Sequence, residues 1–190
     1  DYPQHIDRLL IGVTCPASFK GTSWFNSDSW GSEQHYIKDT NVAVTVYTNE
    51  HLGLKVSQTD FVHPVKPVFT RYYEVENIGV NELDPGFTVY TSAISSNQQP
   101  SGVIYDDKLS AVIHYRHGYY YSICSDTAAG QYQLGGDALG NAGNGQLYGN
   151  DTIGMMADAS LMWGNVVLSA GGRLVFALHI CMASELKDLK

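Results

Sequence analysis

Residues 69–77 read FTRYYEVEN, and this stretch decides the fold class. Its odd-numbered positions carry Phe, Arg, Tyr and Val before the final Asn, while its even-numbered positions carry Thr, Tyr, Glu and Glu. Successive side chains of a β-strand point to opposite faces of a sheet, so the pattern predicts a strand with one face in a core and one nearer to water. Pro64 and Pro67 cannot donate ladder hydrogen bonds, which predicts that residues 62–68 form a crossing connection or a strand edge.

Further strands are expected on both sides of this stretch. Residues 42–48 (VAVTVYT) are β-branched and alternating, and residues 109–116 and 119–124 flank a His-Gly turn in the manner of a hairpin. Roughly ten short strand-like runs, with no convincing helix before residue 184, predict an all-β antiparallel sandwich with one core. The expected core residues are Val44, Val46, Tyr73, Val75, Ile113, Phe176, Leu178 and Ile180.

The last expected strand, residues 174–182 (LVFALHICM), is apolar on both faces. Fully buried strands carry apolar side chains on both sides, so we expect this one to lie inside the fold. Residues 184–190 (SELKDLK) are charged and predict the start of a helix or of a linker. The sandwich domain is therefore assigned to residues 1–183.

The composition limits the classes of partner. The 190 residues carry 11 Lys and Arg against 19 Asp and Glu, a net charge of −8, and no stretch gathers the basic side chains that nucleic acid needs. No apolar run approaches the roughly 20 residues of a membrane span, so we expect a soluble protein, extracellular or cytoplasmic. The chain begins at Asp1, which favours a trimmed or processed piece of a longer polypeptide.

No motif for catalysis, a metal or a cofactor is evident. The adjacent carboxylates Asp106 and Asp107 are typical of a hairpin turn and not of an acid and base pair. The seven histidines show no metal-ligand spacing. Cys15, Cys124 and Cys181 allow at most one disulfide, and we expect Cys124 and Cys181 to be small buried hydrophobes.

Residues 126–151 are rich in Gly, Ala and Asn and show little periodicity, which predicts a long structureless loop. Apolar anchors in such a loop have little use unless a partner covers them, so we interpret the loop as a domain interface. Without the partner it would be mobile or would favour self-association. The anchors are Tyr132, Leu134, Leu139, Leu147 and Tyr148.

The 13 Tyr and 3 Trp suggest a second interpretation, because sugar rings stack on exposed aromatic faces. Most strand aromatics belong to cores or to cross-strand pairs. Three aromatic residues lie instead in the polar segment 21–36 and are the candidate sugar contacts. They are Trp24, Trp30 and Tyr36.

Four segments carry a family resemblance when they are taken together. They read LGLKV (52–56), DFVHP (60–64), RYYEVEN (71–77) and IHYR (113–116). In order and spacing they resemble the amino-terminal domain of family 15 glycoside hydrolases, which include glucoamylases, glucodextranases and trehalase-like enzymes. The resemblance covers most of residues 40–183, whereas residues 1–39 match weakly.

The resemblance implies a super-β-sandwich that packs on an (α/α)6 catalytic barrel of the same polypeptide. The catalytic glutamates of that family belong to the barrel, so we expect no enzyme activity from this chain alone. The parent would hydrolyse α-glucans or trehalose with inversion. A stand-alone carbohydrate-binding sandwich, with Trp24, Trp30, Tyr132 and Tyr148 as contacts, is the alternative function.

Overall fold

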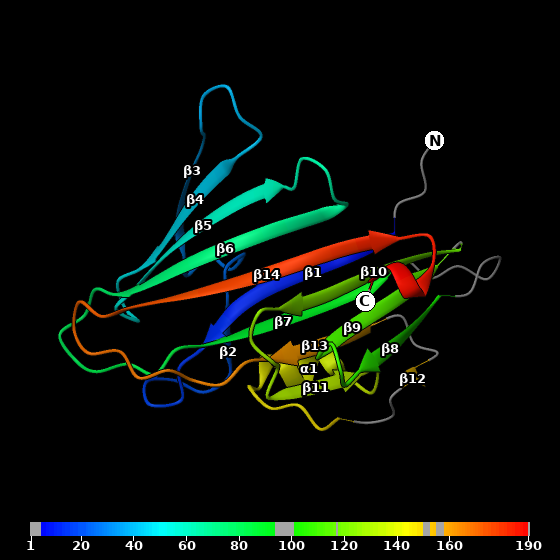
Figure 1. Cartoon of the computed structure of the whole chain (residues 1–190). Coiled ribbons are helices and arrows are strands. Elements are labelled where there is room, and N and C mark those ends of the chain that lie inside the picture. The colour runs from blue at the N-terminus through cyan, green and yellow to red at the C-terminus, as the bar shows by residue number, and fades with distance from the viewer. Residues whose placement is uncertain (1–4, 94–100, 117, 150–152, 155–157, 190) are drawn as a thin grey trace.

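The computed structural model describes residues 5–93, 101–116, 118–149, 153–154 and 158–189. Within these ranges the chain folds into two antiparallel sheets that pack face to face (Figure 1). This arrangement confirms the predicted all-β antiparallel sandwich. The two short helices are α1 (Ala138–Gly143) and the 3-10 turn η1 (Leu186–Leu189), and neither is long or apolar enough to cross a membrane.

The two sheets differ in width over the described residues. The smaller has five strands in the order β11 (Gln131–Leu134), β13 (Asp158–Met162), β7 (Gly86–Ala93), β1 (Ile6–Thr14) and β2 (Thr22–Trp24). The larger has nine, in the order β12 (Ile153–Gly154), β8 (Gly102–Asp106), β9 (Ala111–Arg116), β10 (Tyr119–Ser125), β14 (Arg173–Ala183), β6 (Val68–Asn77), β5 (Leu54–Val62), β4 (Ala43–Asn49) and β3 (Gly31–Tyr36).

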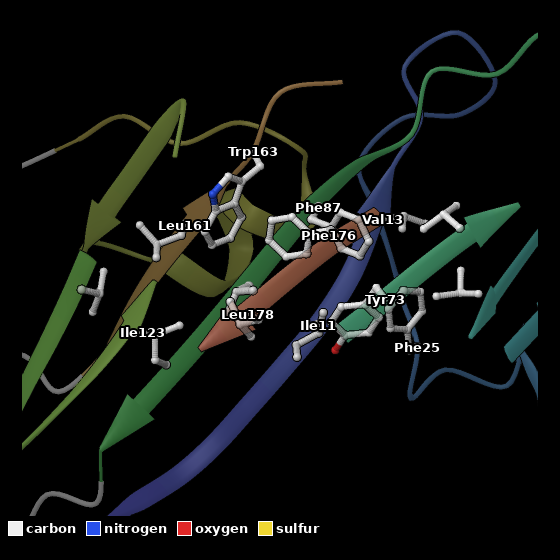
Figure 2. Close-up of a cluster of buried hydrophobic side chains, with 14 of the residues drawn as sticks. Ile11, Val13, Phe25, Tyr73, Phe87, Ile123, Leu161, Trp163, Phe176 and Leu178 are labelled. Carbon is white, nitrogen blue, oxygen red and sulfur yellow. The ribbon is translucent and has the colours of Figure 1, made fainter. Parts of the chain in front are cut away.

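Aromatic side chains join the two sheets at the centre of the sandwich (Figure 2). Phe87 of β7 stacks on Phe176 of β14 with ring centroids 4.2 Å apart, and Tyr73 of β6 lies 5.2 Å from Phe87. Trp163 meets the edge of Phe176 at 4.9 Å.

Six of the eight predicted core residues are buried: Tyr73, Val75, Ile113, Phe176, Leu178 and Ile180. The expected facing of β6 and β14 is confirmed, but that of β9 is wrong. Ile113 is in the outer-face row of Ser122 and Cys181, and Val112 faces the core instead.

The predicted facing of β4 is wrong. Val44 and Val46 pair with Thr59 and Ser57 of β5 on the outer face of the larger sheet and are only half-buried. The inner face of β4 carries Tyr47 instead, which stacks on Phe25 at 5.0 Å. A valine-rich strand face indicates that the face is buried, but it does not indicate which element packs against it.

Strand β14 is also less enclosed than its sequence predicts. Its inner face lies in the core, whereas Val175 on the outer face is 59% exposed. Ala177 and Cys181 on that face are half-buried. The strand is therefore apolar on two sides and covered on one.

The β5–β6 hairpin replaces the crossing connection or strand edge expected at residues 62–68. His63 Nδ1 accepts hydrogen bonds from the backbone N–H groups of Val65 (3.2 Å) and Lys66 (3.0 Å), which turns the chain at the tip. The two prolines are tolerated because residues 63–67 lie outside the ladder. The resulting register pairs Asp60 with Arg71.

His114 of β9 is fully buried and stacks on Tyr121 of β10 with ring centroids 4.6 Å apart. Neither ring nitrogen has a hydrogen-bond partner in the described part of the chain. Desolvation lowers the pKa of His114 to about 3. The imidazole is therefore neutral in the folded protein.

We expect Phe176→Ala to lower the free energy of unfolding by about 3–5 kcal/mol, because it leaves a cavity among Phe87, Tyr73 and Trp163. The matched control is Val175→Ala on the exposed face of the same strand, with an expected change within about 0.5 kcal/mol. Chemical denaturation measures both values. A loss below about 1 kcal/mol for Phe176→Ala would show that the aromatic cluster does not hold the sheets together.

We also expect a pH dependence from His114. The unfolded imidazole titrates near 6.5 and the folded one at about 3, so the unfolded chain binds more protons between these values. The stabilisation is complete above about pH 6.5 and is lost as the pH falls, by about 2 kcal/mol at pH 5. His114→Phe should remove this dependence of the free energy of unfolding on pH, measured by denaturation at a series of pH values, whereas the exposed control His51→Phe should keep it. An equal pH dependence in the two variants would show that His114 is not its source.

Candidate functional site

The larger sheet extends beyond the smaller one at the end formed by β3, β4, β5 and β6, which rise away from β1 and β2 (Figure 1). A cleft of about 290 Å3 lies there between β1 and the inner face of the larger sheet. It is open to solvent and combines apolar and polar walls. Its lining residues are Leu9, Leu10, Ile11, Phe25, Asn26, Ser32, Tyr47, Gln58 and Arg71.

Antiparallel pairing places a row of polar side chains on the inner face beside this cleft. Arg71 of β6 is opposite Asp60 of β5, and Gln58 of β5 is opposite Thr45 of β4. Gln34 of β3 continues the row and donates from Nε2 to Thr45 Oγ1 at 2.8 Å. The inner face therefore changes from aromatic core to polar surface along the length of the strands.

Asp60 organises this row. Its Oδ2 accepts a hydrogen bond from Gln58 Nε2 at 2.8 Å, and its Oδ1 lies 3.3 Å from Arg71 Nε. The second contact is close but not aligned as a hydrogen bond, and both of its atoms have no other partner among the described residues. Burial raises the pKa of Asp60, while the Arg71 charge and the Gln58 hydrogen bond oppose the shift.

The aromatic residues proposed from the sequence as sugar contacts do not form one surface. Trp30 is buried, with Nε1 donating to Ser23 Oγ at 2.9 Å and its ring against Phe25 at 5.1 Å, so it belongs to the core. Trp24 is half-buried and packs against the small cluster formed by Ala142, Leu147 and Met162. Tyr36 alone of the three is exposed, at 72%. It ends β3 on the inner face, two strands from Asp60 in the register.

Residues 126–149 are ordered, which corrects the expectation of a structureless loop without a helix; residues 150–151 lie outside the described residues. The segment forms β11 and α1. Gln133 is buried at its centre, where Nε2 donates to the carbonyls of Gly135 (3.1 Å) and Gly136 (2.8 Å). Its Oε1 accepts from Asn141 Nδ2 at 3.1 Å and from the Tyr148 N–H at 3.2 Å.

The five predicted anchors of this segment have different environments. Leu134 and Leu147 are buried within this chain. Tyr132 is half-buried and stacks on Tyr105 of β8 with centroids 3.7 Å apart, and Leu139 is half-buried in α1. Only Tyr148, at 62%, is exposed. A role of the segment in meeting a partner therefore rests on Tyr148, with the half-buried Tyr132 and Leu139 as further candidates.

No carboxylate lines the cleft, so no acid and base pair faces it. Asp106 Oδ1 accepts from the backbone N–H groups of Lys108 (3.0 Å) and Leu109 (3.1 Å), so it stabilises the β8–β9 turn as predicted. No group of three or more His, Cys, Asp or Glu residues is placed to hold a metal in the described ranges. Cys15, Cys124 and Cys181 are free thiols, and Cys124 and Cys181 are half-buried instead of buried.

Gln58 and Arg71, which line the cleft, and Asp60, which contacts both, were not identified from the sequence as a site. The signal was present, because Asp60 and Arg71 belong to two of the segments that carry the family resemblance. Recognising residues 63–67 as a hairpin tip would have placed these two side chains opposite each other.

The sandwich fold is that of part of a bacterial glucoamylase. This chain matches the crystal structure of that enzyme complexed with acarbose at a TM-score of 0.74 and 9% sequence identity, over 98% of this chain and 29% of the glucoamylase chain. The GH36 α-galactosidase AgaB of Geobacillus stearothermophilus is also similar over 97% of this chain and 30% of its own, but at a TM-score of 0.41 it carries no weight. Both are glycoside hydrolases, and this chain spans less than a third of each.

Sequence comparison does not assign a family. No model of a known family matches the chain. Maturase K of Tigridia pavonia is 30% identical over 79 residues, which are 42% of this chain and 15% of that protein. The match to the glucoamylase therefore establishes a shared fold and leaves the function to be argued from the chain itself.

We expect Gln133→Leu to loosen residues 135–148, because it leaves two carbonyls and a buried N–H without their partner, at a cost of about 1–3 kcal/mol. Amide hydrogen exchange in this segment should accelerate. The matched control is the exposed Gln146→Leu, which should leave exchange unchanged. Identical protection in both variants would mean that the segment is held by other contacts.

Proposed function

We propose that this chain is the non-catalytic amino-terminal β-sandwich module of a family 15 glycoside hydrolase that acts on α-glucans or trehalose. The observation that carries the proposal is the match of 98% of this chain to only 29% of a glucoamylase. In this proposal residues 1–183 are the module, residues 184–190 begin the linker, and an (α/α)6 catalytic barrel of the same polypeptide is the partner.

The outer face of the larger sheet is the surface that we assign to the barrel. Ala177 of β14 is opposite Tyr72 of β6, Tyr72 is opposite Thr59, and Thr59 is opposite Val44. The adjoining row runs from Val175 through Glu74 and Ser57 to Val46. Two strands, β4 and β14, thus independently present apolar side chains on this face, where Val44 and Val46 are half-buried and Val175 is 59% exposed.

Charged side chains on this face gather near the start of β14 and on the edge strand β3, where Glu33 is opposite Val46. Arg173 bridges Glu74 at 3.2 Å and Glu76 at 3.3 Å. Protein interfaces commonly combine an apolar centre with a polar rim, and this distribution fits that anatomy. In the absence of the barrel, the same surface favours self-association of the module. Tyr148 of the β11–α1 segment is a second proposed contact.

We expect the purified chain to hydrolyse neither maltose, maltooligosaccharides nor trehalose, because inverting hydrolysis needs an acid and a base about 6.5–9.5 Å apart on opposite sides of the substrate. The cleft is lined by no carboxylate. Release of glucose measures activity, and the full polypeptide that carries the chain is the positive control. Turnover by the chain alone that disappears in Asp60→Asn or Asp106→Ala would overturn the proposal.

We expect Val175→Lys to destabilise the full polypeptide, because burying an unpaired ammonium in a domain interface is costly. The matched control is Val65→Lys at the β5–β6 hairpin tip, where the valine is 87% exposed. In the isolated chain both variants should unfold at the wild-type temperature. In the full polypeptide only Val175→Lys should lower the melting temperature and promote separation of the domains after limited proteolysis.

Equal behaviour of the two lysine variants in the full polypeptide would remove the outer face from the interface. A loss seen only with Tyr148→Lys would assign the interface to the β11–α1 segment instead.

A further inference from the structure

We propose that the cleft between β1 and the inner face of β4, β5 and β6 binds a neutral mono- or disaccharide, with Gln58 and Arg71 as its polar contacts and Asp60 as their positioning residue. This inference does not depend on the proposed function. The cleft lies on the inner face of the strands whose outer face we assign to the barrel. Each proposal can therefore fail without the other.

The hydrogen bonding of the polar row leaves a donor and an acceptor directed at the cleft. Asp60 engages Gln58 through Nε2 and Arg71 through Nε. Gln58 Oε1 accepts no hydrogen bond from another described residue. The Arg71 guanidinium lies over the Phe69 ring, 5.4 Å from its centroid, and near the Tyr73 hydroxyl. Both Gln58 and Arg71 line the cleft. A hydroxyl group is both donor and acceptor, so adjacent hydroxyls of a sugar match a guanidinium beside an amide oxygen.

The charges at the cleft favour a neutral ligand. Arg71 is the charged residue of its lining, and Asp60 lies directly against that guanidinium. Asn26 and Ser32 add neutral polar groups to the lining, without side-chain hydrogen bonds to other described residues. An anionic ligand would bring its charge near Asp60, whereas a sugar would use the same groups without a net charge.

The remaining walls suit the C–H faces of a sugar ring. Leu9, Leu10 and Ile11 of β1 form one side, and the stacked rings of Phe25 and Tyr47 form another. Tyr36 is on the same face of the sheet, in the cross-strand row of Ala43 and Asp60, and its ring is exposed. The volume of about 290 Å3 is at the lower end of ligand pockets and limits the occupant to one or two sugar units.

The test is a titration of the 15N-labelled chain with maltose, with trehalose and, as an anionic probe, with inorganic phosphate. We expect saturable shifts from a sugar at the amides of residues 9–11, 32–36, 45–47, 58–60 and 71. Gln58→Leu should weaken binding roughly tenfold, the effect of one lost hydrogen bond in a buried site. Tyr36→Ala should weaken it severalfold and, at 72% exposure, leaves the fold intact.

Tyr148→Ala is the matched control, because it removes an equally accessible tyrosine from another surface and should leave sugar binding unchanged. The proposal is overturned if neither sugar gives saturable shifts, or if Tyr148→Ala abolishes binding while Tyr36→Ala does not. It is also overturned if phosphate binds at these amides and the sugars do not, since the cleft would then be an anion site. The spectrum of Gln58→Leu outside the cleft reports whether that variant folds.

Discussion

The difference in width between the two sheets governs the rest of this structure. Where the five-stranded sheet covers the nine-stranded sheet, the two inner faces meet in an aromatic core. Its side chains are Tyr73, Phe87, Phe176 and Trp163. At the edge of the smaller sheet, a cleft separates β1 from the inner face of β4, β5 and β6. The same strands there replace core residues by Gln58, Asp60 and Arg71, and the cleft follows from that transition.

The outer face of the larger sheet has the opposite character, because it carries apolar side chains that are partly exposed to solvent. Its centre carries Val44, Val46, Tyr72 and Val175, which are more apolar than a solvated sheet face requires. A sandwich that stood alone would have little reason to keep β14 apolar on both sides. In the proposed function, a second, larger domain against this face would account for the pattern.

The sequence was informative where one face of a strand is packed within this chain. Residues 69–77 and 174–180 were faced correctly because their alternation reflects the core that the chain itself supplies. Val44 and Val46 were predicted to face the core but lie half-buried on the outer face of the larger sheet, and we attribute their apolar pattern to the proposed partner domain. Pattern alone cannot distinguish an intramolecular cover from an intermolecular one.

The sequence did not predict that the Gly-rich segment is ordered, and it did not predict the cleft; the two omissions have different reasons. Four hydrogen bonds of Gln133 hold the segment, and composition does not reveal such tertiary contacts. The cleft depends on the register of the β5–β6 hairpin, which prolines made difficult to recognise. Trp30 was assigned to the surface because its neighbours are polar, although its ring packs on Phe25.

The central claim is that the outer face of the larger sheet is covered by a catalytic domain. Hydroxyl-radical footprinting of Tyr72, in this chain alone and in the full polypeptide that carries it, tests that claim most directly. Tyr72 is 40% exposed here and should be oxidised readily in the isolated chain but slowly in the full polypeptide. Tyr36, on the inner face of the same sheet, should be oxidised at the same rate in both proteins. Equal oxidation of Tyr72 in the two proteins would contradict the account.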